Sequence, residues 1–259
     1  MTNTSKANVQ SAQTSQAAKP LPLELRDVSV TFGSGAREVH ALRGVNLQLH
    51  HGELVAVMGP SGSGKSTLLN VAGLLQPATS GSVMVSGKDA TQLSAAEAAK
   101  LRRRHLGVVF QHFNLVPTLT VGENITLPLE LDGLSPAQCR ERAEEALEAV
   151  ELEGLADRFP EEVSGGQAQR IAIARALIGP RGVLLADEPT GALDTSTADA
   201  VMKILRARVD SGASGILVTH EPRFAAWADR VLMMRDGVLT GENGAAGQEG
   251  NDGEGAIQQ

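Results

Sequence analysis

Residues 59–66 read Gly-Pro-Ser-Gly-Ser-Gly-Lys-Ser and constrain this chain more than any other segment. They match the pattern G-x-x-x-x-G-K-[ST], after an apolar run at residues 54–58 and before a helical stretch predicted at residues 67–75. Glycines let the backbone curl until several N–H groups face one anion, and the positive end of the following helix adds to the attraction. The segment therefore predicts a phosphate-binding loop between a buried strand and a helix.

Residues of this loop have separate predicted roles. Lys65 is expected to reach the β- and γ-phosphates of a nucleotide, Ser66 to ligate Mg²⁺, and Thr67 to contact the α-phosphate. The predicted phosphate-binding residues are Gly59, Pro60, Ser61, Gly62, Ser63, Gly64, Lys65, Ser66 and Thr67. A Gly-rich turn without a ligand is the alternative, which the strand–loop–helix context disfavours.

A second apolar run, at residues 183–186, ends in the two acids Asp187 and Glu188. Ligands of open α/β sheets bind at the carboxyl ends of the strands. Two adjacent acids point in different directions, so that one can hold Mg²⁺ while the other orients the attacking water. We assign Asp187 to the metal and Glu188 to the water. Without a phosphate loop elsewhere in the chain, two solvated acids at a strand end would explain the pattern equally well.

Further apolar runs indicate the fold class. Short runs at residues 107–110 and 216–218 resemble the one at residues 54–58, and helical segments separate them. This order is typical of a mostly parallel sheet with crossover helices. Capping boxes at Ser94 and Ser135 begin two helices, and we expect a helical subdomain at about residues 112–180, inserted between two parts of the sheet domain. Asp236-Gly237 predicts a hairpin near the end of the core.

The two ends of the chain differ from its centre. Residues 1–20 are rich in Ser, Thr, Gln and Ala, whereas residues 242–259 are acidic and Gly-rich. Both segments are predicted to be disordered, which leaves residues 21–241 as the folded domain.

Composition excludes several function classes. A net charge of −7 and an aromatic content of 2% disfavour a nucleic-acid-binding protein. Cys139 is the single cysteine, so the chain cannot form an intramolecular disulfide. No apolar run approaches the roughly 20 residues that a membrane-spanning helix needs. We expect a soluble, cytoplasmic protein whose membrane role, if it has one, depends on a partner.

A further Gly-rich segment, Ser164-Gly165-Gly166-Gln167, opens the helical run at residues 168–178. It offers backbone N–H groups and a hydroxyl to an anion, but no counter-charge. On its own, the segment is better explained as a plain helix cap.

Taken together, these segments resemble the ATP-binding cassette (ABC) ATPase family over about residues 22–240. Residues 59–66 resemble the Walker A loop, residues 183–188 the Walker B strand with its catalytic glutamate, and residues 163–167 the family signature. Four more positions follow in the family's order: Phe32 as the aromatic that stacks on adenine, Gln111 as the Q-loop glutamine, Ala192-Leu193-Asp194 as the D-loop, and His220 as the switch histidine.

The subfamily of macrolide exporters, lipoprotein-release ATPases and the cell-division ATPase is the most similar. Residues 37–42, 102–104, 108–110 and 113–120 carry this resemblance. It implies a P-loop NTPase (RecA-like) core with a mostly parallel sheet, an N-terminal antiparallel β part and an inserted α-helical subdomain. It also implies an ATPase that uses ATP and Mg²⁺.

The resemblance further implies a homodimer in which each ATP lies between the Walker A loop of one subunit and the signature of the other. The implied catalytic residues are Lys65, Gln111, Glu188 and His220, and the implied Mg²⁺ ligands are Ser66, Gln111 and Asp187. Nucleotide contacts beyond the phosphate loop are implied for Phe32, Gln111, Ser164, Gly165, Gly166, Gln167, Asp187, Asp194 and His220. An integral membrane permease is the implied partner, and it would hold the chain at the inner face of the plasma membrane.

The sequence disfavours two other functions. A soluble ABC ATPase not linked to transport would contain a long coiled coil, a Cys₄ zinc insertion or two cassettes, and the sequence has none of these. A P-loop kinase or GTPase would leave residues 164–167 without a role. The cargo stays open among peptide, drug and lipoprotein, as does force transmission to a wall enzyme.

Overall fold

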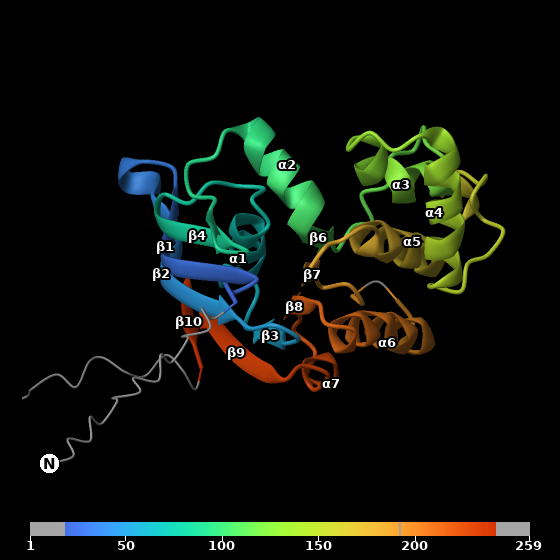
Figure 1. Cartoon of the computed structure of the whole chain (residues 1–259). Helices are drawn as coiled ribbons and strands as arrows, with labels where there is room; N and C mark the ends of the chain where they lie inside the picture. Colours follow the sequence, from blue (N-terminus) through green and yellow to red (C-terminus); the bar gives the residue numbers. More distant parts are fainter. Residues whose placement is uncertain (1–18, 192, 242–259) are drawn as a thin grey trace, which may run out of the picture.

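The computed structural model describes residues 19–191 and 193–241, which form two sheets with helices between and beside them (Figure 1). Almost all of the two tails predicted to be disordered, together with Ala192, lies outside the described residues.

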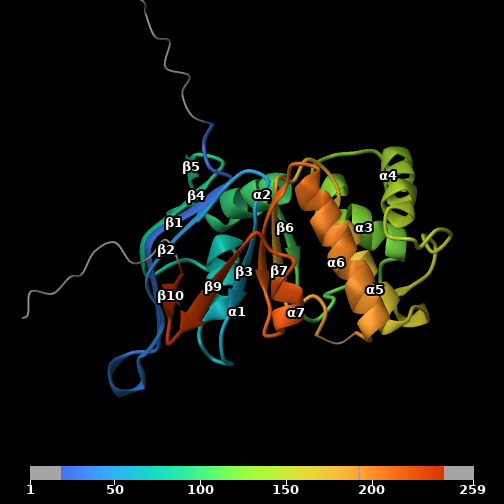
Figure 2. The same cartoon turned by 90° about the horizontal axis from the view of Figure 1, so that it is seen from below.

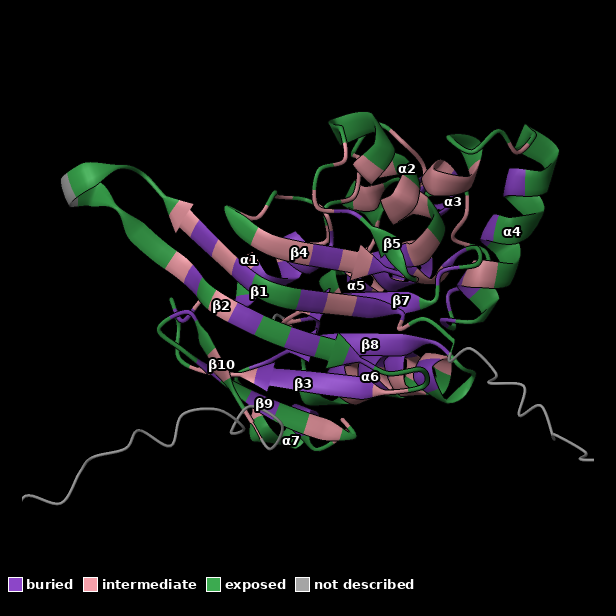
Figure 3. Cartoon of the chain, turned by 60° about the vertical axis from the view of Figure 1, so that its left-hand side comes forward, coloured by how far each residue is buried: buried purple, intermediate pink, exposed green. Residues whose placement is uncertain are grey.

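The larger sheet has six strands in the order β10-β9-β3-β8-β7-β6, and all except β10 run parallel. Its strands are β3 (Leu54–Met58), β6 (Leu106–Val109), β7 (Val183–Asp187), β8 (Ser214–Val218), β9 (Arg230–Arg235) and β10 (Val238–Thr240). The central strands are buried along almost their whole length (Figure 3). The predicted mostly parallel sheet is thus confirmed, as is the Asp236-Gly237 hairpin, which joins β9 to β10.

The second sheet is antiparallel, with the order β2-β1-β4-β5. Its strands are β1 (Leu23–Phe32), β2 (Val39–Leu49), β4 (Ser80–Val85) and β5 (Lys88–Asp89). Val28 and Val30 of β1 are buried. The pairing of β1 with β2 shifts between Val30 and Thr31, and Phe32 at the end of the strand is 46% exposed.

Helices cover both faces of the parallel sheet. Helix α1 (Lys65–Ala72) packs between the two sheets, where Leu68 and Val71 join one hydrophobic cluster. On the opposite face, α6 (Thr195–Asp210) and α7 (Pro222–Ala225) contribute to a second cluster, to which Met202 and Phe224 belong. Successive residues of β7 and β8 face opposite clusters, so both faces of the sheet are sealed from water at its centre. At the edge, Val231 and Met233 of β9 are exposed.

A third hydrophobic cluster lies among helices beside the sheets (Figures 1 and 2). It is formed mainly by α3 (Val121–Glu130), α4 (Pro136–Glu148) and α5 (Gly165–Leu177). Helix α2 (Ala95–His105) lies apart from them and leads into β6. The capping boxes at Ser94 and Ser135 are formed as predicted. A third capping box, at Thr120, begins α3 and was missed, although the spacing Thr120-x-x-Glu123 signals it.

Candidate nucleotide-binding site

The phosphate loop follows β3 and ends at α1, which begins at Lys65, two residues earlier than expected. Gly59 and Gly64 both have positive φ angles, of 154° and 108°. A Cβ atom at Gly59 would collide with the Met234 carbonyl oxygen, and one at Gly64 with that of Ala41. The loop therefore needs glycine at both positions, because neighbouring backbone leaves no space for a side chain.

Lys65 lies against the curled backbone of this loop. Its ammonium donates hydrogen bonds to the carbonyl oxygens of Gly59 and Pro60, both over 2.8 Å. The side chain is largely buried, so the positive charge is held at the bottom of the loop, next to the amino end of α1. This arrangement gathers two sources of positive potential at one place, as a phosphate group requires.

Asp187 ends β7 close to the same loop. Burial raises the pKa of its carboxyl group and the negative charge of Glu188 raises it further, whereas a hydrogen bond from Ser66 and the charge of Lys65 oppose the rise. Because desolvation disfavours the charged form of a half-buried carboxylate, a nearby cation would stabilise that form.

Glu188 is the point at which three parts of the site meet. Its carboxylate accepts a hydrogen bond from the Gln111 amide over 3.3 Å and lies 3.1 Å from His220 Nδ1. Its backbone is left-handed, with φ of 44°, a conformation that costs energy for a residue with a Cβ. The parallel sheet brings the three residues together, because β6, β7 and β8 are neighbours and their carboxyl ends share one edge.

These residues line a pocket of about 810 Å³. Among the predicted site residues, it is lined by Gly59, Pro60, Ser61, Gly62, Gly64, Lys65, Ser66, Thr67, Gln111, Asp187, Glu188 and His220. Ser63 is not on the pocket wall and is 3% exposed beneath the loop.

Two walls of the pocket were not predicted. One comes from β2, and the other from the hairpin between β9 and β10; together they supply Val39, His40, Ala41, Arg43, Asp236 and Gly237. Gly237 links the hairpin to both the phosphate loop and β2. Its N–H donates a hydrogen bond to Ser63 O of the loop, and its carbonyl accepts one from Arg43 N of β2, each over 2.9 Å. The Asp-Gly turn was visible in the sequence, but its contact with the phosphate loop depends on strand order.

Phe32, Asp194 and residues 164–167 lie outside this pocket. Ser164 caps α5 in a reciprocal capping box with Gln167. Asp194 caps α6 and accepts hydrogen bonds from Ser196 and Thr197, which hold the pKa of its carboxyl group far below its usual range. The predicted nucleotide contacts of these residues stay predictions.

The residues predicted to hold Mg²⁺ have the chemistry that this ion prefers. Ser66, Gln111 and Asp187 all offer oxygen atoms and line the same pocket. Within residues 19–191 and 193–241, no group of three or more His, Cys, Asp or Glu side chains is arranged to enclose a metal ion. Mg²⁺ needs no such cage, since it is commonly held by one or two protein groups together with substrate phosphates.

A phosphate loop after the central strand β3, with a carboxylate pair at the end of β7, two strands further along the sheet, defines a P-loop NTPase. Residues 42–191 match the model of a family described as ABC transporter. The macrolide export ATP-binding/permease protein MacB of Shigella flexneri is 46% identical over 217 residues, which are 84% of this chain and 34% of that protein. MacB of Escherichia coli strain K12 has the same identity and coverage.

A solved dimeric structure of the ATP-binding cassette MJ0796, in a post-hydrolysis state with ADP and Pi, aligns with a TM-score of 0.79. Its sequence is 41% identical, and the alignment covers 84% of this chain and 96% of that one. The chain belongs to the ABC transporter family and has the fold of its ATPase cassette. It spans about a third of the length of the curated relatives it matches.

None of the helices in the described part of the chain combines the length and apolar character needed to span a membrane.

Proposed function

We propose that this chain binds and hydrolyses ATP and uses the energy to drive a membrane permease. The observation that carries the proposal is the position of Glu188, which lies in the phosphate-loop pocket between Gln111 and His220. A carboxylate held on two sides next to a phosphate site is placed to orient water for attack on a terminal phosphate.

Each residue has a separate task in the proposed reaction. Backbone N–H groups of the loop bind the phosphates, and Lys65 balances the charge on the β- and γ-phosphates. Glu188 orients the attacking water and accepts its proton, while His220 holds the carboxylate and contacts the γ-phosphate. Ser66, Gln111 and Asp187 would hold Mg²⁺, which, when bound, neutralises charge that develops on the phosphates.

We further propose that the active form is a dimer. Residues 164–167 lie outside the pocket of their own chain, and their backbone N–H groups and the Ser164 hydroxyl would complete the site of a second copy. The solved cassette MJ0796 is described as dimeric, which supports this arrangement.

A contact within the chain supports coupling between the site and the helices. Arg175 of α5 donates hydrogen bonds to the carbonyl oxygens of Phe113 and Asn114, over 2.8 and 2.6 Å. These carbonyls follow Gln111 closely in the chain. A displacement of Gln111 by the γ-phosphate would therefore act on α5, which begins with the signature residues.

We propose a permease as the partner because the curated relatives are ATP-binding/permease proteins. The apolar stretch Phe113 to Leu119 borders the proposed contact surface, and the chain would then work at the inner face of the plasma membrane. In this scheme residues 21–241 form the ATPase domain, and residues 112–180 are its helical subdomain.

Hydrolysis and its stimulation test the proposal in two stages. We expect Mg²⁺-dependent phosphate release that Lys65→Ala abolishes and that Lys203→Ala, at an exposed position of α6, leaves unchanged. Adding the permease in lipid nanodiscs should stimulate the rate, whereas DNA or ribosomes should not. Stimulation by DNA or ribosomes alone would instead favour a cassette not linked to transport.

A further inference from the structure

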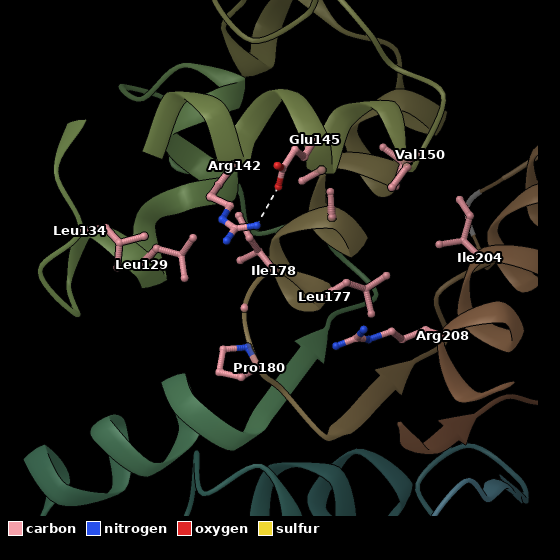
Figure 4. Close-up of a pocket in the computed structure, with 14 residues that line it drawn as sticks. Leu129, Leu134, Arg142, Glu145, Val150, Leu177, Ile178, Pro180, Ile204 and Arg208 are labelled. Carbon is pink, nitrogen blue, oxygen red and sulfur yellow. Dashed lines mark hydrogen bonds and ion pairs between the residues drawn. The ribbon is translucent and has the colours of Figure 1, made fainter. Parts of the chain in front are cut away.

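A second pocket lies on another part of the molecule, between the helical cluster and α6 (Figure 4). Its walls come from the carboxyl-terminal half of α4, the end of α5, the turn after α5, and the carboxyl-terminal half of α6. It shares no lining residue with the nucleotide-binding pocket. Neither the proposed ATP reaction nor the capping of these helices gives it a role.

The pocket is apolar and large enough for a small organic molecule. Its volume is about 650 Å³, within the range of about 300–1,000 Å³ that ligand sites occupy. Its apolar lining residues include Leu129, Val150, Leu177, Ile178 and Ile204. Ile204 packs against both the helical cluster and the cluster beneath α6, so this wall is a fixed part of the core.

Two arginines give this apolar space a positive charge. Arg142 of α4 and Arg208 of α6 extend toward the segment Ile178–Pro180 from opposite sides (Figure 4). Arg142 pairs with Glu145 over 2.8 Å, and Glu145 is the only acidic residue that lines the pocket within the described part of the chain. The lining therefore carries two guanidinium groups against one carboxylate.

Arg208 is incompletely satisfied by the protein. Its Nη2 donates to the Arg181 carbonyl over 3.2 Å, whereas its Nη1 donates no hydrogen bond within the described part of the chain, and the residue lines the pocket. Arg181 itself is buried and bonded to backbone carbonyls of Arg103, Arg175 and Ala176. A guanidinium nitrogen at the pocket without a protein acceptor is free to bind a ligand, and an anion is the partner that a guanidinium binds most strongly.

We propose that this pocket binds a small amphipathic carboxylate, such as a medium-chain fatty acid. The alkyl chain would fill the apolar space between α4, α5 and α6, and the carboxylate would bind Arg208, with Arg142 beside it. The ligand would bridge the helical cluster to α6, so it would act on the relative movement of these parts.

Calorimetric titration of the full chain with decanoate, below its micelle concentration and without nucleotide, tests this site. Decanol is the matched ligand, since it keeps the chain and lacks the charge. We expect saturable binding of one decanoate per chain, and weaker binding of decanol by about tenfold or more. Equal binding of both ligands, or no saturable heat with decanoate, would overturn the proposal.

Three variants locate the site. Arg208→Gln should weaken decanoate binding by about tenfold, whereas Lys203→Gln, which removes an exposed charge from the same helix, should leave it unchanged. Ile204→Trp should abolish binding by filling the pocket. Equal effects of Arg208→Gln and Lys203→Gln, or undiminished binding to Ile204→Trp, would place decanoate elsewhere and overturn the assignment. Because no nucleotide is present, the result does not depend on the proposed ATP reaction.

Discussion

The Gln111 amide donates a hydrogen bond to the Glu188 carboxylate over 3.3 Å, although the two residues are 77 positions apart in the sequence. They follow the neighbouring strands β6 and β7, so the sheet brings them together. Gln111 is also close in the chain to the carbonyl groups that Arg175 holds. Glu188, which would orient the attacking water, is thereby linked through Gln111 to α5, the helix that begins with the signature residues.

Replacing Glu188 by Gln should separate nucleotide binding from hydrolysis. The amide keeps the size of the side chain but accepts a proton poorly, so the hydrolysis rate should fall by about 100-fold or more. ATP should still bind, and the variant should accumulate as an ATP-bound dimer in light scattering with Mg²⁺. Glu141→Gln, at an exposed position of α4, is the control for lost charge. A variant that stays monomeric with ATP would contradict the proposed dimer.

Asp187 should make the folded chain less stable when it is charged. Its pKa is raised above the ordinary value of 3.8 chiefly by burial, so the folded state holds the proton more tightly than the unfolded state does. The loss of unfolding free energy caused by the charged Asp187 is therefore absent below pH 3.8 and grows as the pH rises through the raised pKa. Asp187→Asn should raise the Tm at neutral pH, and this gain should shrink on acidification. Thermal melts of both proteins across a pH series measure this difference in Tm. A lower Tm of Asp187→Asn than of wild type at neutral pH would contradict the prediction that the charged carboxylate destabilises the fold.

Gly237 should support the phosphate loop from the hairpin. Its φ is 80°, its N–H donates to Ser63 O, and a Cβ there would lie 2.9 Å from the Ala41 carbonyl oxygen. Gly237→Val should cost about 1–3 kcal/mol of unfolding free energy and weaken ATP binding, because the hairpin must move away from the loop.

Gly52→Val is the matched control for Gly237→Val. Gly52 has a similar φ of 71°, but nothing lies within 4 Å of its Cβ position, and it does not line the nucleotide-binding pocket. Denaturant unfolding and ATP calorimetry of both variants separate backbone strain from the contact. Equal ATP affinities would remove Gly237 from the support of the loop.

Asp194 has a structural task that can be separated from its predicted nucleotide contact. Its carboxylate caps α6, and Asn caps helices about as well as Asp does. Asp194→Asn should therefore keep the Tm, whereas Asp194→Ala should lower it. If ATP affinity and hydrolysis by Asp194→Asn match wild type while its Tm is unchanged, Asp194 acts as a cap alone. A loss of ATP affinity without a change in Tm would support the nucleotide contact.

Short-range features were accessible from the sequence because each depends on a few neighbouring residues. The capping boxes at Ser94 and Ser135 need only a hydroxyl and a side chain three residues later. Asp236 and Gly237, with φ of 49° and 80°, form the tight turn that an Asp-Gly pair favours. The end of α1 was placed too late, because Gly73 and Leu74, with φ of 55° at Leu74, end the helix after Ala72.

The sequence by itself determined the curled backbone of the loop before Lys65, since that conformation is encoded in the loop's own glycines. The resemblance placed Gln111, Glu188 and His220 in the same site, and the order of the strands decided how they meet. Only the tertiary structure decided that β2 and Gly237 complete the pocket, that Asp194 is used as a helix cap, and that Arg142 and Arg208 face one apolar space. Those contacts join segments far apart in the chain, and they depend on strand register and helix packing, which no local pattern encodes.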